Sequence, residues 1–417
     1  MKYLIFTGSI LNMGGAQMYV KNKTEYMRSA GWEVYVFSGL EGTVMLGGLM
    51  KYKDMIIPEL DCYPDMISDR KKKQIIKLMM NIIDVSAPTE ETIIIESNTL
   101  HMSCWAEMLA EKLRAKHYMF LLDEHFNYGE EYYDFIEFKY KRSETAVIKG
   151  DYIRALLKNC VKVDDPSRWQ LNAFCTNVVE DIKDERFDHI GHDEFDCILC
   201  SLGRLNKSYI PNVAEGFEKF AAGNPDKKIC CVFIGDQPVG YTPDMNKLIE
   251  RKLSGLKYVT LLMMGYVYPI PESFLRQTDV AVAVSGSASV LWSYGVKTIT
   301  MDVSDNQPIG VLGYTTKNNL NRDGETVCSL DIWLERIVNK NYLSDYIFEP
   351  KKMTDASKWF EKHMEFVEKS CREKEYYNMY GVRTRTFKKR LKKILICIFG
   401  VGGSHRIVSS FKNLFDR

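Results

Sequence analysis

Two cations, Arg204 and Lys207, lie three positions apart in the segment Gly203-Arg204-Leu205-Asn206-Lys207, directly after an apolar run typical of a β-strand. In an open α/β sheet, ligands bind at the carboxyl ends of the strands. An arginine can donate two parallel hydrogen bonds to phosphate oxygens, and a lysine adds a point charge. The spacing therefore indicates a diphosphate site, with a solvated basic turn as the alternative.

A hydroxyl-rich segment follows another apolar run and leads into a helical pattern. Glycine and small hydroxyl residues at a helix start present N–H and O–H donors to an anion. An ordinary serine cap is the alternative interpretation. The candidate phosphate-binding residues here are Ser285, Gly286, Ser287, Ala288 and Ser289.

Two more strand ends carry glycines that would border the same cleft. Gly235 and Asp236 follow one apolar run, and Gly265, Tyr266 and Val267 follow the next. The backbone groups of the second segment are candidates for contacting the edge of a base. Each segment is a weak signal when taken alone.

The N-terminal part offers a glycine-rich junction between a strand and a helix. Gly14 and Gly15 precede a helical pattern that includes Gln17, and a helix start of this kind favours an anion. The spacing of these glycines is not that of a dinucleotide-binding fingerprint. A plain turn is the alternative.

Two histidines follow other strands of the N-terminal part. His101 comes after the strand predicted at 92–96, and Asp123-Glu124-His125 comes after the one predicted at 117–122. A histidine at this edge can orient or deprotonate a substrate hydroxyl, although a hydrogen-bonded structural role is the more common one. We therefore take His101 and His125 as catalytic candidates beside Arg204 and Lys207.

The elements that must position these residues form two successive β/α alternations, which are typical of parallel sheets covered by helices. We expect a polar, histidine-rich linker at 187–194 between them and a long amphipathic helix at 355–377. The expected strands are 2–6, 33–37, 92–96 and 117–122, then 196–202, 228–234, 258–262, 280–284 and 298–301.

Bulk properties describe an ordinary globular chain of 417 residues with a net charge of +1. Ten Lys or Arg and one acid lie between 383 and 417, so this tail carries +9 and the remainder −8. That asymmetry argues against nucleic acid as a partner and favours an anionic membrane surface for the segment 383–399, with a disordered basic tail as the alternative. We recognise no signal peptide and no apolar run long enough to span a membrane, so we expect a cytoplasmic protein that attaches peripherally to the inner face of the plasma membrane.

Cysteine usage supports a reduced compartment, because the eleven cysteines are odd in number and scattered. Cys197 and Cys200 form the one Cys-x-x-Cys pair. They fall in a predicted strand, where residues three apart face opposite sides of the sheet, so we expect structural thiols and no metal site.

The order of these motifs resembles glycosyltransferase family 4 and its GT-B relatives in bacterial capsule and exopolysaccharide synthesis. The resemblance covers about residues 1–350 and rests on Gly14–Gln17, the Ala-Gly-Trp-Glu-Val segment at 30–34, the Gly-Arg-Leu…Lys segment at 203–207 and the Gly-x-Val segment at 265–267. It implies an α/β fold of two facing Rossmann-like domains with parallel sheets, with a C-terminal helix that packs back on the first domain. The implied domains are 1–190 for the acceptor, 191–352 for the donor nucleotide, 353–380 for the crossing helix and 381–417 for the basic tail.

The resemblance implies a metal-independent hexosyltransferase that needs no cofactor beyond its donor, a UDP- or GDP-sugar. The acceptor would be a hydroxyl of a lipid-linked or polysaccharide glycan. Family members carry two glutamates, eight apart, where this chain reads VAVSGSASVLWSY at 282–294 without a carboxylate. This departure keeps two alternatives open, a sugar-nucleotide 2-epimerase and a catalytically inactive GT-B partner protein.

Overall fold

The computed structural model describes residues 1–11, 13–88, 91–123, 126–175, 177–237, 242–351, 356–370, 375–383 and 387–415. The chain divides into two compact units. Unit 1 comprises Met1–Cys175 together with Asp355–Arg417, and unit 2 comprises Thr176–Thr354. His125 lies outside the described residues.

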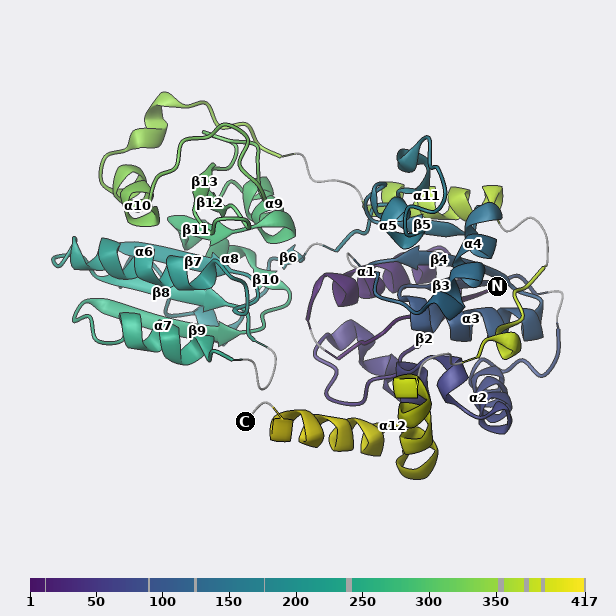
Figure 1. Ribbon diagram of the computed structural model, residues 1–417. Helices are drawn as coiled ribbons and strands as arrows, with labels where there is room; N and C mark the ends of the chain where they lie inside the picture. The colour runs from purple at the N-terminus through teal and green to yellow at the C-terminus, as the bar shows by residue number, and fades with distance from the viewer. Residues whose placement is uncertain are drawn as a thin grey trace. The chain divides into compact units, whose positions relative to one another are not determined.

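Unit 1 contains a five-stranded sheet in the order β2-β1-β3-β4-β5, in which all neighbouring strands are parallel (Figure 1). Apolar side chains alternate to both faces, so each face needs a helical cover. Helices α2, α3 and α4 cover one face of the sheet. Helices α1 and α11 lie at the other face and contact each other. The strands are β1 (Lys2–Phe6), β2 (Glu33–Phe37), β3 (Ile93–Ser97), β4 (Lys116–Leu121) and β5 (Thr145–Val147), and the helices are α1 (Gly15–Ser29), α2 (Asp69–Ile82), α3 (Leu100–Leu113), α4 (Tyr133–Lys141), α5 (Tyr152–Leu156), α11 (Ala356–Lys369) and α12 (Phe387–Phe415).

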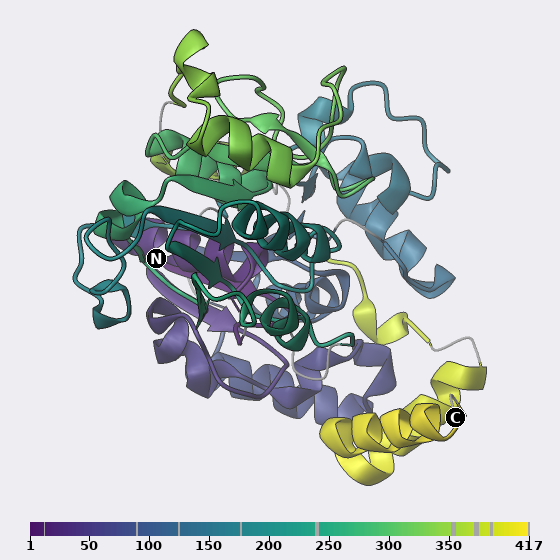
Figure 2. The ribbon, with the colours of Figure 1, turned by 90° about the vertical axis from the view of Figure 1, so that its left-hand side faces the viewer.

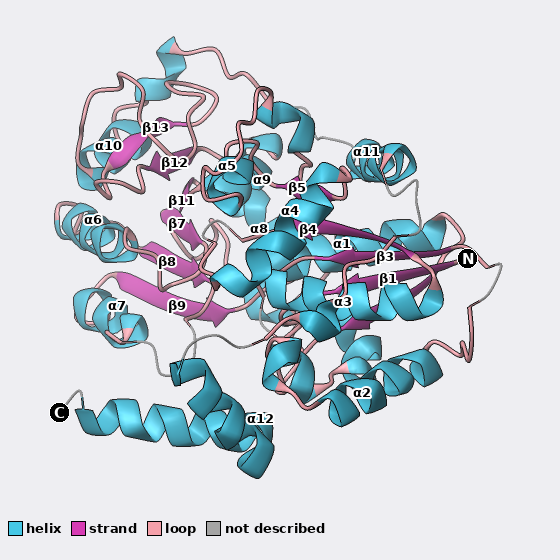
Figure 3. Ribbon diagram, turned by 45° about the vertical axis from the view of Figure 1, so that its right-hand side comes forward, coloured by secondary structure: helices cyan, strands magenta, loops and turns pink. Residues whose placement is uncertain are grey.

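Unit 2 contains a six-stranded sheet in the order β13-β12-β11-β7-β8-β9, seen in magenta in Figure 3. All its pairings are parallel except that of β12 with β13. A separate parallel pair joins β6 and β10. The strands are β6 (Val179–Glu180), β7 (Cys197–Leu202), β8 (Ile229–Ile234), β9 (Val259–Gly265), β10 (Ile270–Pro271), β11 (Val280–Ala283), β12 (Thr298–Met301) and β13 (Pro308–Val311), and the helices are α6 (Ile210–Ala222), α7 (Met245–Leu253), α8 (Glu272–Gln277), α9 (Ser285–Ser293) and α10 (Leu330–Val338).

Every strand expected from the sequence is present within a few residues, because continuous apolar runs identify strands that are buried on both faces. The two cysteines of the Cys-x-x-Cys pair behave as expected: Cys197 packs in the core on one face of β7, and Cys200 packs on the other. The segment 135–158 contains α4, the edge strand β5 and α5. Strand β13 was not expected.

The linker expected at 187–194 is wrong. Phe187 and Ile190 are buried in the core of unit 2, and the Phe187 ring packs on Phe274 at 4.7 Å between centroids. The unit already begins at Thr176, earlier than the boundary expected at residue 190, because β6 pairs with β10. In the sequence, Phe187 and Ile190 are spaced three apart within a polar, histidine-rich segment, and this apolar spacing was the only local indication of a core position.

The crossing helix packs on the first unit, as expected. Helix α11 is shorter than the predicted helix and ends at Lys369. Its Phe360 ring lies 5.2 Å from that of Tyr26 on α1, and its His363 side chain is almost fully buried. Beyond it, Tyr377 is not helical, and its backbone N–H donates to Glu107 on α3.

A buried carboxylate, Glu96 on β3, joins β1, β4 and α1 through hydrogen bonds. Its oxygens accept hydrogen bonds from the hydroxyls of Tyr3 (2.6 Å), Tyr19 (2.7 Å) and Tyr118 (2.5 Å). Burial by itself would raise the pKa of Glu96, but nearby Lys23, His363 and the tyrosine donors bring it below its usual value. Burial lowers the pKa of Lys23 to about 8, with Glu96 opposing the change.

The substitution Glu96→Gln tests this network. It leaves the buried Lys23 ammonium without its counter-charge, so we expect a loss of about 3 kcal/mol in the free energy of unfolding, measured by urea denaturation. The same exchange at Glu25, a half-exposed residue of α1 paired with Lys21, is the control and should cost under about 1 kcal/mol. Equal effects of the two substitutions would show that Glu96 has no special role.

Candidate functional site

The loops that follow β7, β8 and β9 are joined to one another at the carboxyl edge of the unit 2 sheet. The backbone N–H of Gly203 donates to Ile234 (2.9 Å), that of Leu205 to Asp236 (3.0 Å), and that of Gly235 to Gly265 (2.8 Å). The glycines and Asp236 predicted from three separate strand ends are therefore brought together in one surface.

Gly235 must be a glycine for this arrangement to form. Its φ is +139°, and a Cβ atom there would lie 2.0 Å from the carbonyl oxygen of Gly203. The backbones after β7 and β8 therefore approach more closely than any side chain allows.

Arg204 projects from this surface as an exposed side chain. Its guanidinium makes no hydrogen bond or ion pair with any described residue. Burial raises the pKa values of Tyr209 and Tyr266, and the nearby charge of Arg204 opposes this rise. Asp236 also acts on Tyr266. Lys207 is exposed in the same loop, and its N–H donates to the Arg204 carbonyl at 3.3 Å.

The hydroxyl-rich segment begins α9 at the end of β11, which pairs with β7, so it adjoins the Arg204 loop at the same edge. Ser285 has a left-handed backbone with φ +54°, a strained conformation for a residue other than glycine. Its N–H donates to the carbonyl of Asn319 (2.7 Å). The first turn of α9 contains no acidic side chain, which leaves the helix start suited to an anion.

Two residues that the sequence did not indicate complete this segment. The Asn319 side chain donates to the Ser285 carbonyl (3.2 Å) and to Ser289 Oγ (3.1 Å), and Lys351 Nζ donates to the same Ser289 oxygen (2.9 Å). Burial lowers the pKa of Lys351. Since Lys351 stands 62 positions after Ser289, no local pattern could have linked them.

Two of the predicted binding residues have buried side chains. Val267 and Ala288 are both fully buried in the core that includes Leu291 and Phe274. The Val267 carbonyl accepts a hydrogen bond from Asn177 Nδ2 (3.3 Å). Any contact that these two residues make to a ligand would therefore use backbone atoms.

In unit 1 the predicted glycine junction is held by a hydrogen bond between the start of α1 and the loop before it. Gly14 caps α1 with an extended backbone, and Gly15 is exposed at the first helical position. Gln17 Nε2 donates to the Ser9 carbonyl (2.9 Å), which fixes the loop after β1. The helix has no acidic residue in its first turn.

His101 lies at the start of α3, after β3, and faces this loop. A Cβ atom on Gly8 would lie 3.8 Å from His101 Cε1. Its Nδ1 is 3.3 Å from the Thr99 hydroxyl, whereas its Nε2 is buried with no hydrogen-bond partner among the described residues. Burial lowers the pKa of His101 to about 4, so the imidazole is neutral at pH 7.

Asp123 follows β4, the neighbour of β3, and was not among the predicted catalytic residues. Burial raises the pKa of Asp123 to about 6, and burial together with the nearby Asp123 raises the pKa of Tyr63. The Tyr63 ring lies 6.0 Å from that of His101. The carboxyl edge of the unit 1 sheet thus holds a neutral imidazole, which can orient a hydroxyl, and a carboxyl group whose raised pKa suits proton transfer.

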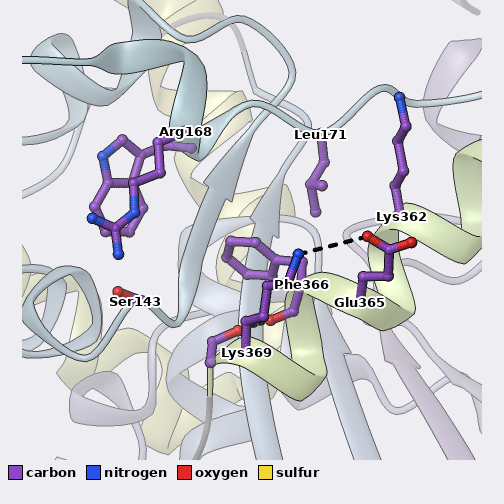
Figure 4. Close-up of a pocket in the computed structure, with 9 residues that line it drawn as sticks. Ser143, Arg168, Leu171, Lys362, Glu365, Phe366 and Lys369 are labelled. Carbon is purple, nitrogen blue, oxygen red and sulfur yellow. Dashed lines mark hydrogen bonds and ion pairs between the residues drawn. The ribbon is translucent and has the colours of Figure 1, made fainter.

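A different hollow of unit 1, with a volume of about 300 Å³, contains none of the predicted site residues (Figure 4). It lies between α11 and the segment 168–171 and has Phe366 on its wall. Lys369 pairs there with Glu365 at 3.7 Å, and both side chains are exposed. We assign it no role in the chemistry. No cluster of potential metal ligands occurs among the residues that the structure describes.

No protein-family model matches the chain, and no curated protein matches its sequence. A glycosyltransferase structure from Rickettsia africae ESF-5 is similar at 11% identity and a TM-score of 0.52, over 88% of this chain and 94% of that one. A UDP-forming trehalose-phosphate synthase from Burkholderia xenovorans is similar at 12% identity and 0.50, over 89% and 100%.

A UDP-GlcNAc 2-epimerase from Neisseria meningitidis bound to UDP-GlcNAc also matches, at 13% identity and a TM-score of 0.49, over 89% of this chain and 100% of that one. At identities this low, structural similarity shows the fold alone. Together with the two mainly parallel α/β sheets and the returning helix α11, the similarity to the glycosyltransferase and the trehalose-phosphate synthase confirms the GT-B fold class.

Gly235→Ala tests the joined loops of unit 2. The new methyl group must displace the backbone at Gly203, so we expect a loss of roughly 1–3 kcal/mol in stability, measured by urea denaturation. Gly255→Ala is the control, because a Cβ atom there meets nothing within 4 Å. A Gly235→Ala protein as stable as the control would contradict the close approach.

Asp123→Asn tests the buried carboxyl group through stability. In the folded protein the pKa of Asp123 is about 6, whereas the usual pKa of an aspartate is 3.8. The unfolded chain therefore loses this proton more readily, and the native carboxyl destabilises the fold once the pH rises past both pKa values. We expect Asp123→Asn to be on the order of 2 kcal/mol more stable than the native protein at about pH 8, with the difference vanishing near pH 3. Asp134→Asn, at an exposed position on α4, should show no such pH-dependent gain.

Proposed function

We propose that this protein transfers a sugar from a nucleoside diphosphate sugar to a hydroxyl of a lipid-linked or polysaccharide acceptor in cell-surface glycan synthesis. The proposal rests chiefly on Arg204: an exposed guanidinium with no described ion-pair partner, in a loop joined to two others and adjacent to an acid-free helix start. A diphosphate matches this combination, because it needs both cationic and N–H donors.

In the proposed reaction the acceptor oxygen forms a bond to the anomeric carbon as the bond from that carbon to the diphosphate oxygen breaks. The electron pair of the broken bond leaves with the diphosphate, where Arg204 and Lys207 stabilise the developing charge. Gly235, Asp236, Gly265 and Tyr266 would border the nucleotide, and Ser285, Gly286, Ser287 and Ser289 would supply further donors.

Unit 1 would supply the acceptor-side groups. Asp123 is a suitable group to receive the proton of the attacking hydroxyl, because its raised pKa matches a general base that works near neutral pH. His101 is neutral and keeps an unused buried Nε2, so it would orient a hydroxyl rather than carry charge. Gly14, Gly15 and Gln17 would shape the loop beside them.

A sugar-nucleotide 2-epimerase is the second candidate, and Asp123 is the observation that favours it. Epimerisation moves a proton at a carbon of the sugar and needs an acid or base whose pKa lies near the working pH. It needs no acceptor. The two candidates share the donor diphosphate site and differ in what the donor does after binding.

Calorimetry with UDP- and GDP-sugars tests the donor site directly. We expect Arg204→Ala to weaken binding roughly ten- to hundredfold, because it removes charge-assisted hydrogen bonds to phosphate. Arg251→Ala, at an exposed position on α7, is the control and should bind as the native protein does.

Turnover then separates the candidates. Nucleotide release that depends on an added glycan acceptor supports transfer, whereas inversion at sugar carbon 2 without an acceptor, followed by NMR, supports the epimerase. Binding without either reaction would identify an inactive partner protein. Unchanged binding in Arg204→Ala would contradict the donor site itself.

A further inference from the structure

Helix α12 is attached to unit 1 along one face of its first arm. The helix bends at Gly400, where φ is +71°, and Figure 2 shows its two arms in yellow. Before the bend, Lys389 pairs with Glu131, Lys393 Nζ donates to the Asp65 carbonyl (2.7 Å), and Ile396 is buried with 5% exposed. This face contacts the short 3₁₀ helices η2 (Pro58–Asp61) and η3 (Pro64–Met66).

The opposite face of the same arm is apolar and exposed. Leu391, Ile394 and Ile398 follow one another at helical spacings of three and four, so they form one stripe. Their exposed fractions are 50%, 54% and 65%. Phe399 extends the apolar surface at the bend, with 53% exposed. These four residues are named the α12 ridge.

Cations border the α12 ridge on both sides. At 100° per residue, Arg390 falls on one side of the stripe and Lys392 on the other, between the ridge and the attached face. Arg390 is exposed and Lys392 is partly exposed, and neither makes an ion pair with a described residue. The sequence from 383 to 415 contains no acidic residue.

A helix with an apolar stripe between basic flanks is the form that lies in the interface of a bilayer. Its ridge can enter the boundary of the acyl chains while the flanking cations meet the phosphates of the lipid headgroups. The described part of the chain contains no helix long and apolar enough to cross a membrane. A narrow apolar ridge flanked by Arg390 and Lys392 complements a continuous anionic surface better than the pocketed surface of a folded partner.

We propose that the α12 ridge docks unit 1 onto an anionic phospholipid surface. The docking uses none of the residues assigned to sugar transfer, so its test does not depend on the proposed function. Attachment through η2 and η3 makes the helix part of the folded unit, and the whole of unit 1 is therefore held at the surface.

Co-sedimentation of the full chain with vesicles tests this docking. We expect binding to vesicles of phosphatidylglycerol and phosphatidylcholine in equal parts, and little binding to phosphatidylcholine alone. The triple variant Leu391→Ser, Ile394→Ser and Ile398→Ser should weaken the partition at least about tenfold, because three apolar side chains no longer enter the bilayer. The double variant Arg390→Gln and Lys392→Gln should weaken it about fivefold per cation removed.

The matched control exchanges three apolar residues of similar exposure elsewhere in unit 1, Met45→Ser, Met50→Ser and Leu78→Ser, and should bind as the native protein does. All substituted side chains are partly or largely exposed, so thermal unfolding should stay unchanged and a binding loss cannot be ascribed to misfolding. Native-like binding by the triple variant, equal binding to both vesicle types, or no binding to either would overturn the proposal. Concentration-dependent dimerisation that the triple variant abolishes would instead identify a second copy of this chain as the occupant.

Discussion

Unit 1 depends on a carboxylate that is fully buried in its sheet. Glu96 is fully buried in the central region of a parallel sheet, and such a charge is tolerated only if hydrogen bonds and counter-charge replace its hydration. Tyr3, Tyr19 and Tyr118 bring the donors from β1, α1 and β4, and Lys23 brings the charge. The Lys23 ammonium in turn lies over the rings of Tyr3 and Phe360, at 5.2 and 5.0 Å.

This requirement explains why the C-terminal helix returns to the first unit. Phe360 and His363 of α11 cover the polar cluster, and His363 Nε2 also contacts the Asn172 carbonyl at 3.0 Å. Without the helix, the cluster would meet solvent, and the buried cation would lose its aromatic cover. The returning helix is thus part of the unit 1 core, although the whole of unit 2, Thr176–Thr354, separates it from the strands in the sequence.

The two carboxyl edges carry different electrostatics, and this difference shapes the proposed chemistry. The unit 2 edge presents Arg204, Lys207 and an acid-free helix start, with the Lys351 ammonium one turn further along α9. The unit 1 edge presents Asp123 and a neutral His101. The segment 282–294 has serines and no carboxylate, and one of these serines, Ser289, accepts a hydrogen bond from Lys351. In the proposed reaction a donor would therefore meet positive charge and hydroxyl groups there.

The sequence alone determined the strands, most helices and the edge at which the candidate residues gather, because periodicity and strand-end position are local properties of the chain. It also indicated Arg204 and the serine segment as candidates. These two follow β7 and β11, which pair in the sheet. Tertiary structure decided the rest. Glu96 looked like the end of an apolar strand until distant tyrosines and Lys23 were brought to it, and Phe187 and Ile190 looked like linker residues until the core of unit 2 enclosed them. Lys351, the buried Nε2 of His101 and the raised pKa of Asp123 likewise arise from packing between segments far apart in the chain, which no pattern within a single segment can record.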